Sequence, residues 1–175
     1  MQYQNKLYVA LAISLISLVG CDDEKDVNYT MDVSADITVI ATLGIESAQS
    51  AESARFNPDA SEGFQSNNTT SSLVNSMKFN ALQLVVNSPE DKDLSFIDDV
   101  EVYILDEFDN EVRIGFVNNV GSSRSVSLSR DNVDVQEYLK QSAVGFRIVY
   151  TSDEFAQDNR ECTITGRVSV DAIEK

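Results

Sequence analysis

The chain has 175 residues, carries a formal net charge of −16 at pH 7, and contains no histidine and no tryptophan. Nucleic acids and anionic lipid head groups repel so acidic a chain, and we expect neither as a partner. Without histidine the chain cannot build a Ser-His-Asp triad, a Cys-His pair or a histidine-ligated zinc site. A non-enzymatic function is therefore favoured.

Residues 1–20 have the pattern of a secretory signal peptide. Lys6 and the amino terminus supply positive charge, and residues 7–19 are apolar apart from Ser14 and Ser17. A helix that crosses the hydrocarbon core needs about 20 apolar residues, whereas the central part of a signal peptide has roughly 7 to 15. Residues 1–20 are therefore predicted to be removed on export.

The end of this segment resembles the lipobox of bacterial lipoproteins, because it reads Leu18-Val19-Gly20-Cys21. The resemblance implies that diacylglycerol is attached to the Cys21 sulfur, that the chain is cut before Cys21, and that the new amine is acylated. Two or three acyl chains anchor a protein stably, whereas one binds only marginally. Cys21 would then hold the protein on the lipid bilayer. The alternative is a plain signal peptide or a poor transmembrane helix that ends in an unrelated cysteine.

An acidic cluster directly follows Cys21. Its residues are Asp22, Asp23, Glu24, Lys25 and Asp26. The cluster resembles two sorting signals: an aspartate after the cysteine retains enterobacterial lipoproteins in the inner membrane, whereas an acidic run in other Gram-negative groups exports them to the outer face of the outer membrane. The run exceeds a single aspartate, which favours the outer membrane and the cell surface. Residues 21–27 also predict a solvated tether, since like charges keep a linker extended.

The mature chain is predicted to be one domain. Removing residues 1–20 leaves 155 residues and changes the net charge to −17, because the segment holds one lysine and no acidic residue. That length is sufficient to bury a core. With Cys21 acylated, Cys162 has no disulfide partner, and its alternation with apolar neighbours such as Ile164 predicts a small buried hydrophobe. The predicted organisation is a signal peptide at 1–20, a tether at 21–27 and a sandwich domain at 28–175.

Seven segments show the period-two alternation of half-buried strands. They are residues 29–42, 81–87, 100–106, 112–118, 124–129, 143–151 and 161–171. One short helix is predicted at residues 134–141, where Asp134 can cap the first turn and Glu137 can reach back. Val133 can then pack on Tyr138. The pattern predicts an all-β, antiparallel two-sheet sandwich of about seven strands with one short helical crossover.

The acidic segment 106–111 has two interpretations. As a hairpin with a two-residue turn at 109–110, it pairs Asp106 with Arg113, Leu105 with Ile114 and Tyr103 with Phe116. As a calcium site, it would supply oxygen ligands from Asp106, Asp109, Asn110 and Glu111. Arg113 neutralises one would-be ligand and the spacing does not match an EF-hand loop, so the hairpin is favoured. We expect no other cofactor.

A long polar connection at residues 43–76 does not fit a minimal sandwich. A connection of this length is either functional or disordered. Residues 46–55 predict a short helix within it. Phe56 and Phe64 are candidate ligand-stacking rings, or plugs that pin the connection to the sandwich. Phe155, in an acidic loop further along the chain, is the third candidate for ligand binding.

The arrangement as a whole resembles small bacterial surface lipoproteins with an immunoglobulin-like β-sandwich. The resemblance rests on the lipobox, the acidic tether and segments 82–89, 96–104 and 133–140, and it brings no catalytic residues. We therefore expect a lipid-anchored, non-enzymatic module that presents its loops to another envelope protein or a glycan, although the lack of tryptophan weakens the glycan interpretation. Two alternatives stay open: a hydrolase with two carboxylates about 5 to 10 Å apart, and a purely structural spacer.

Overall fold

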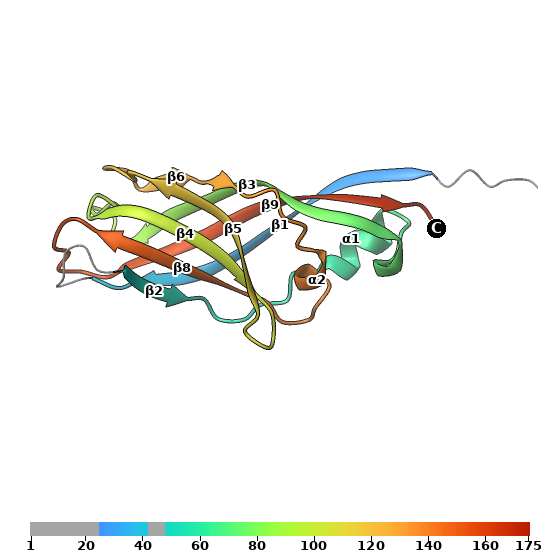
Figure 1. Cartoon of the computed structure of the whole chain (residues 1–175), viewed down its shortest axis with the longest axis horizontal. Coiled ribbons are helices and arrows are strands. Elements are labelled where there is room, and N and C mark those ends of the chain that lie inside the picture. The colour runs from blue at the N-terminus through green and yellow to red at the C-terminus, as the bar shows by residue number, and fades with distance from the viewer. Residues whose placement is uncertain (1–24, 42–47) are drawn as a thin grey trace, which may run out of the picture.

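The computed structural model describes residues 25–41 and 48–175 (Figure 1). Strands run through these ranges as β1 (Asp26–Val39), β2 (Ala48–Glu52), β3 (Val74–Ser88), β4 (Ile97–Leu105), β5 (Glu111–Asn118), β6 (Ser125–Ser127), β7 (Ser129–Arg130), β8 (Gly145–Ser152) and β9 (Arg160–Ile173). The helical segments are α1 (Ala60–Ser66), the 3-10 turn η1 (Ser71–Leu73) and α2 (Gln136–Leu139). No helix within these ranges has the length and apolar character needed to span a bilayer. The signal peptide and Cys21 lie outside the described residues and stay predictions.

The strands form two antiparallel sheets packed face to face. Sheet A has the order β1-β9-β3-β6, and sheet B has the order β2-β8-β4-β5-β7. The predicted all-β antiparallel sandwich is thus confirmed. β6 and β7 can be counted as one strand that crosses between the sheets. The order of the strands in the two sheets is then that of a jelly roll. The likeness to immunoglobulin domains extends only to the two-sheet architecture, because their last two strands share a sheet whereas β8 and β9 do not.

The crossing between the sheets takes place at Leu128. β6 pairs with β3 of sheet A, and β7 pairs with β5 of sheet B. Leu128 between them is buried, and its backbone N–H donates to the carbonyl of Leu82 at 3.0 Å. One short strand therefore closes the same corner of both sheets.

All seven predicted segments contain strands, and the differences lie mainly in the connection at 43–76. The predicted helix at 46–55 is wrong over its described part, because Ala48–Glu52 is β2 and pairs with the edge of β8. The structure adds α1, which the prediction missed. It also starts β3 at Val74, earlier than predicted, because a bulge between Phe79 and Ala81 shifts the alternation of apolar residues.

The two short helices cover the part of sheet A that sheet B does not reach. Figure 1 shows α1 and α2 at the same end as the start of β1 and the C-terminus, which we name the helix end. Leu139 of α2 and Phe64 of α1 are buried there. Asp134 accepts hydrogen bonds from the backbone N–H of Gln136 at 3.1 Å and of Met77 at 3.0 Å, so it holds α2 against β3 rather than forming the predicted capping box.

Cys162 is buried in the centre of sheet A, as its alternation predicted. It lies between Ile37 of β1 and Val86 of β3, and only 1% of its surface is exposed. Burial raises the pKa of its thiol to about 12. A thiol of this kind is almost never ionised near neutral pH, so it serves packing rather than chemistry.

Tyr29 of β1 carries a buried hydroxyl that has no hydrogen-bond partner among the described residues. Its ring lies against α1, where Cε2 is 3.3 Å from the position of a Cβ on Gly63. We expect Tyr29→Phe to raise the free energy of unfolding by about 1 kcal/mol, because it removes the unpaired polar group. Tyr150→Phe is the matched control, since the Tyr150 hydroxyl donates to the Ile40 carbonyl at 2.9 Å and its loss should cost about 1 kcal/mol. Equilibrium urea unfolding measures the change in the free energy of unfolding for both variants. Changes of the same sign would contradict the expectation.

Candidate functional site

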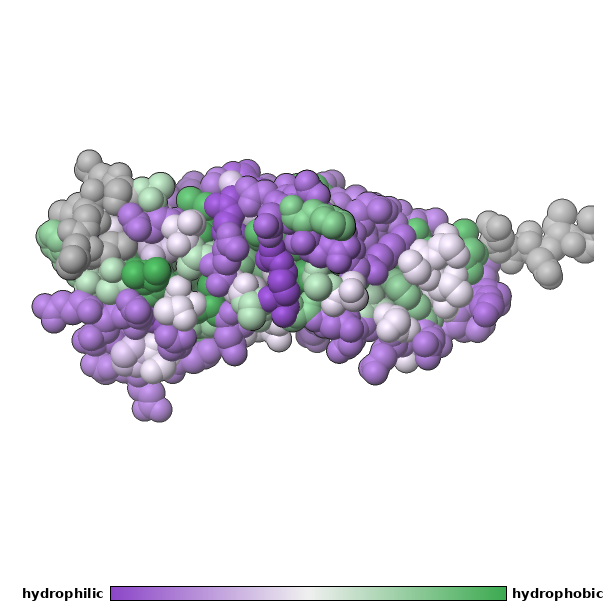
Figure 2. All heavy atoms as spheres, turned by 90° about the horizontal axis from the view of Figure 1, so that it is seen from below, coloured by the Kyte–Doolittle hydropathy of each residue, from purple (hydrophilic) through white to green (hydrophobic). Residues whose placement is uncertain are grey.

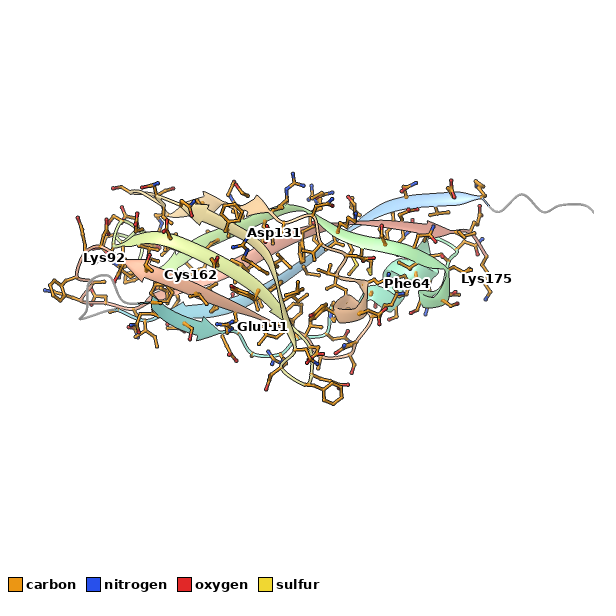
Figure 3. The ribbon with its side chains drawn as sticks, viewed as in Figure 1. Phe64, Lys92, Glu111, Asp131, Cys162 and Lys175 are labelled. Atoms are coloured by element: carbon orange, nitrogen blue, oxygen red, sulfur yellow. The ribbon has the colours of Figure 1, made fainter. Side chains whose placement is uncertain are left out.

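Several loops meet at the end of the sandwich opposite the helix end. They comprise residues 40–41, 89–96, 119–124 and 153–159, and we name them the loop end. Figure 3 shows Lys92 at this end, whereas Phe64 and Lys175 lie at the other. Loops carried by a rigid sandwich are common positions for binding residues, so the structure of these loops decides what they can do.

Arg124 fixes the first of these loops. Its guanidinium donates to the backbone carbonyls of Val86 at 2.9 Å, Asn87 at 3.3 Å, Pro89 at 2.8 Å, Glu90, and Lys92 at 2.9 Å. The neighbouring backbone adds a bond from the Leu94 N–H to the Ser123 carbonyl at 3.0 Å. A planar guanidinium with five donors can satisfy several carbonyls at once, which turns an irregular loop into an ordered one.

Arg160 joins this loop to the loop between β8 and β9. The Arg160 side chain is buried, stacks over the Phe96 ring at 5.1 Å and donates from Nε to the Asp93 carbonyl at 2.9 Å. It also donates to the Asp158 carbonyl. Hydrogen bonds from Ser95 lower the pKa of the Asp93 carboxyl below its ordinary value, and the charge of Arg160 adds to this effect. The two loops therefore form one ordered unit.

Apolar side chains stand exposed on this ordered unit. Phe155 is 63% exposed and Ile40 is 52% exposed. They lie on adjoining segments, because the Ala41 N–H donates to the Asn159 side chain at 2.8 Å. The exposed acidic residues around them are Glu90, Asp91, Asp153, Glu154 and Asp158. An apolar centre with a charged rim is the usual composition of a protein interface. Figure 2 shows hydrophobic residues in small groups within a hydrophilic surface, including groups at this end.

Phe56 and Phe64 do not join Phe155. The Phe56 ring packs against Phe146 with 5.3 Å between the centroids, and its backbone bonds to Val144 at 2.7 and 2.9 Å. Phe64 is 7% exposed and lines a hollow of about 270 Å³ between α1 and α2. Phe64 lies at the helix end, and Phe56 lies beside the residues that lead into β8, at the opposite end of that strand from the β8–β9 loop. Phe56 and Phe64 therefore pack the 43–76 connection against the sandwich, as the second interpretation predicted. Of the three candidate rings, Phe155 is the one that is exposed.

The four predicted calcium ligands are each engaged elsewhere. Asp106 accepts bonds from the N–H of Phe108 and of Asn110, both at 2.8 Å, and from the Asn110 side chain at 2.7 Å. Asp109 pairs with Arg55, and Glu111 pairs with Arg147. The bonds from Asn110 hold the pKa of the Asp106 carboxyl below its ordinary value. Residues 25–41 and 48–175 contain no group of three or more acidic or cysteine side chains placed to hold a metal ion.

The predicted register of this hairpin is wrong. Leu105 faces Glu111 and Tyr103 faces Arg113, so the turn comprises residues 106–110 rather than two residues. The cause is Asp106, whose side chain bonds to the turn backbone and holds it in a wider loop. A bulge at Val102 and Tyr103 then shifts the remaining pairs, and Arg113 bonds to Glu101 instead of Asp106.

The outer face of sheet B carries a charged network that the sequence analysis missed. Arg147 stacks over the Tyr103 ring at 4.7 Å, and Arg113 stacks over the Phe116 ring at 4.9 Å. Glu101 accepts bonds from the Tyr103 hydroxyl at 2.8 Å and from Arg113 at 2.5 Å, and these bonds lower its pKa. The sequence signal that could have indicated this network is the position of Glu101 and Tyr103 two residues apart, which places both on the outward face of β4. Each member already has a partner, so the network stiffens the sheet.

The described carboxyl groups whose pKa departs clearly from its ordinary value all shift in one direction. Where the pKa of a described carboxyl departs clearly from its ordinary value, it is lowered by hydrogen bonds or by arginine and lysine partners. The general acid of a glycoside hydrolase needs the opposite shift, since it must hold a proton near neutral pH.

A shallow hollow of about 460 Å³ lies on the outer face of sheet A. Its polar walls include Asp32, Gln83, Thr165 and Arg167, and its lining contains no aromatic ring. Two of these lining residues, Asp32 and Arg167, pair with each other at 2.8 Å. Sugar rings bind best where they can stack on a flat aromatic face, so this hollow does not favour a glycan.

Comparison with known proteins finds only distant structural likeness. No protein-family model and no curated protein matches the chain. Among solved structures, the chain is similar to one from Desmodium yellow mottle tymovirus, with 9% identity and a TM-score of 0.32 over 100% of this chain and 95% of that one. A Cocksfoot mottle virus structure has 11% identity and a TM-score of 0.30 over 100% and 96%. A carbohydrate-binding module of the β-sandwich superfamily has 11% identity and a TM-score of 0.30 over 84% and 56%. Nothing about function follows from such likeness.

Proposed function

We propose that the protein is a lipid-anchored, non-enzymatic binding module of the Gram-negative cell envelope. Acylated Cys21 would hold it on the outer membrane, and its loop end would bind another envelope protein. The exposed Phe155 and Ile40 on loops that Arg124 and Arg160 keep ordered are the observation that carries this proposal. An exposed aromatic ring on an ordered support binds a partner with little loss of conformational entropy.

The positions of the two ends support the proposal. Cys21 precedes Lys25 by four residues, so the anchor lies within about 14 Å of the helix end, where β1 begins. β1 has 14 residues and extends for about 45 Å toward the loop end. A lipid at Cys21 would therefore keep the helix end near the bilayer and direct the loop end outward.

A protein partner fits the loop end better than a glycan does. The exposed surface there combines two apolar side chains with several acidic ones, and Lys92 is held by Asp91 at 3.6 Å and Asp158 at 3.8 Å. Such a surface matches a partner with an apolar pocket and a basic rim.

Crosslinking on intact cells followed by purification of the protein tests the proposal. Phe155→Ala should reduce the recovery of a specific crosslinked partner by about tenfold, as expected for an aromatic residue at the centre of an interface. Phe108→Ala is the matched control, because Phe108 is 75% exposed but lies in the β4–β5 turn. In the same experiment, Cys21→Ser should move the protein out of the membrane fraction.

Equal recovery of the partner with the Phe155 and Phe108 variants would contradict loop-end binding. A crosslinked glycan in place of a protein would contradict the choice of partner. Retention of the Cys21→Ser variant in the membrane, or an unlipidated amino-terminal cysteine by mass spectrometry, would contradict the anchor.

A further inference from the structure

β1 is a long edge strand that, among the described residues, is paired on one side only. It is the outermost strand of sheet A and pairs there only with β9. The pairing runs from Asp26 opposite Ile173 to Val39 opposite Arg160 without a register shift. Fourteen residues of regular strand at an edge are unusual, because native proteins usually shorten, kink or block such edges.

The backbone of alternate β1 residues points to the free side. In an antiparallel pair, a residue directs both its N–H and its C=O to the same neighbour, and the next residue directs them away. The Lys25 carbonyl accepts from the Glu174 N–H at 2.8 Å, so odd-numbered residues face β9. Even-numbered residues from Asp26 to Thr38 therefore face outward. No hydrogen bond between described residues reaches their backbone groups.

The opposite edge of sheet A is closed, which makes the open side of β1 distinctive. The part of β3 that β6 does not cover is hydrogen-bonded by the chain segment that follows β6 in sequence. Leu128 donates to the Leu82 carbonyl at 3.0 Å, Val135 donates to the Met77 carbonyl at 2.8 Å, and Arg130 donates to the Phe79 carbonyl at 3.4 Å. At the edges of sheet B, β2 has five residues, and β7 pairs with only Gly115 and Phe116 of the eight-residue β5. Among the described strands, β1 therefore has the longest open edge.

β1 lacks most of the devices that normally protect an edge, and its only charged side chains are aspartates. It contains no proline, no lysine and no bulge. On its outer face it carries Asp26, Asp32 and Asp36, separated by hydroxyl and amide side chains, and Asp32 already pairs with Arg167 of β9 at 2.8 Å. On its inner face Val27, Tyr29, Met31 and Ala35 are only half-buried. An additional strand would cover these apolar side chains and meet the aspartates with its alternate residues.

Charge selects the occupant of this edge. The mature chain has a net charge of −17, and β1 itself carries only acidic charges, so a second copy would be repelled. We propose that the free edge of β1 binds an extended basic segment of another protein, in which lysine or arginine alternates with apolar residues. The segment adds to sheet A as a further strand. Its cations face the aspartates, and its apolar residues cover the inner side chains. This surface is separate from the loop end and does not depend on it.

The test uses the mature, lipidated protein in detergent micelles and a capped peptide of about nine residues that alternates lysine with valine or threonine. Hydrogen exchange should show new protection at the N–H groups of even-numbered β1 residues, because odd-numbered ones already bond to β9. A peptide of the same composition in non-alternating order, and one with glutamate in place of lysine, should each bind at least about tenfold more weakly.

Ser34→Pro provides the sharpest variant. Ser34 is exposed and its N–H faces the free side, so proline removes an edge donor without removing a bond to β9. We expect it to weaken peptide binding by about tenfold, whereas the matched Ser34→Ala should bind as the unmodified protein does. Because Ser34→Pro could also disturb the strand, the exchange pattern of the unmodified protein stands as the independent readout.

Three results would overturn the proposal. The first is protection that is absent, or equal at odd and even positions, when the peptide is present. The second is equal binding of the glutamate peptide. The third is a dimer in sedimentation without peptide, with the even-numbered positions already protected, because a second copy would then be the occupant. Phe155→Ala should leave peptide binding unchanged, so failure here is distinguishable from failure of the loop-end function.

Discussion

Gly166→Ala is expected to lower the free energy of unfolding by about 3 kcal/mol. Gly166 lies in β9 at the centre of sheet A, opposite Val33 of β1 and Leu82 of β3. A Cβ at this position would lie 2.8 Å from Cδ1 of Phe79, closer still to its Cε1, and 3.3 Å from Leu82 Cδ2. Phe79 is buried and its ring packs 6.4 Å from Phe146 of the facing sheet, so the ring is held between the sheets.

Equilibrium urea unfolding followed by circular dichroism measures this loss. A double-mutant cycle with Phe79→Leu isolates the clash, and the double variant should lose less than the sum of the two single losses. Ser169→Ala is the control on the outward face of the same strand and should change the free energy by no more than about 0.5 kcal/mol. An equally small loss for Gly166→Ala would contradict the prediction, because it would mean that the Phe79 ring can move away from the new methyl group.

Arg124→Ala is expected to lower the free energy of unfolding by about 2 to 3 kcal/mol. The loss removes charge-assisted hydrogen bonds to five backbone carbonyls between Val86 and Lys92. Water can replace these bonds only where the carbonyls are exposed, and those of Val86 and Pro89 are bonded in partly buried positions. The first effect should be local, with faster hydrogen exchange of the Leu94 N–H in the 89–96 loop.

Arg130→Ala is the matched control for this loss. Arg130 is exposed and its one backbone contact is a long bond to the Phe79 carbonyl at 3.4 Å, so we expect about 0.5 kcal/mol. Arg124→Lys should recover part of the stability, because lysine keeps the charge but cannot bond to five carbonyls at once. Equal losses for the two alanine variants would contradict the role assigned to Arg124.

The strands of this fold could be predicted because their alternation is a local signal. In β1, apolar residues at odd positions and polar residues at even positions predict that the odd-numbered side chains face the core. The structure confirms this, since the odd-numbered residues are the more buried ones. β2 could not be predicted this way. Its residues Ala48–Glu52 are small or polar, and they form a strand because the free edge of β8 supplies backbone partners. Such a strand depends on tertiary pairing rather than on its own pattern.

The loop end was predictable only in part. An aromatic residue in an acidic loop suggested Phe155, and the structure leaves its ring exposed. The order of the surrounding loops was not predictable, because Arg124 and Arg160 act on carbonyls that are distant in sequence. The network on sheet B was missed for a related reason. Its pairs depend on a register that the side chain of Asp106 and the bulge at Tyr103 set.

The position of β9 has a consequence for biosynthesis. Sheet A is centred on β9, which bonds to both β1 and β3, yet β9 is synthesised after all the other described strands. Until residues 160–173 emerge from the ribosome, β1 has no partner in its sheet and β3 has only the short β6. Pairing between β1 and β9 is also slow, because the two strands are far apart in sequence. Sheet A of a nascent chain with this topology therefore stays incomplete until β9 has been made, and a chain without its finished sheet is easier to thread through a translocation pore than a folded one.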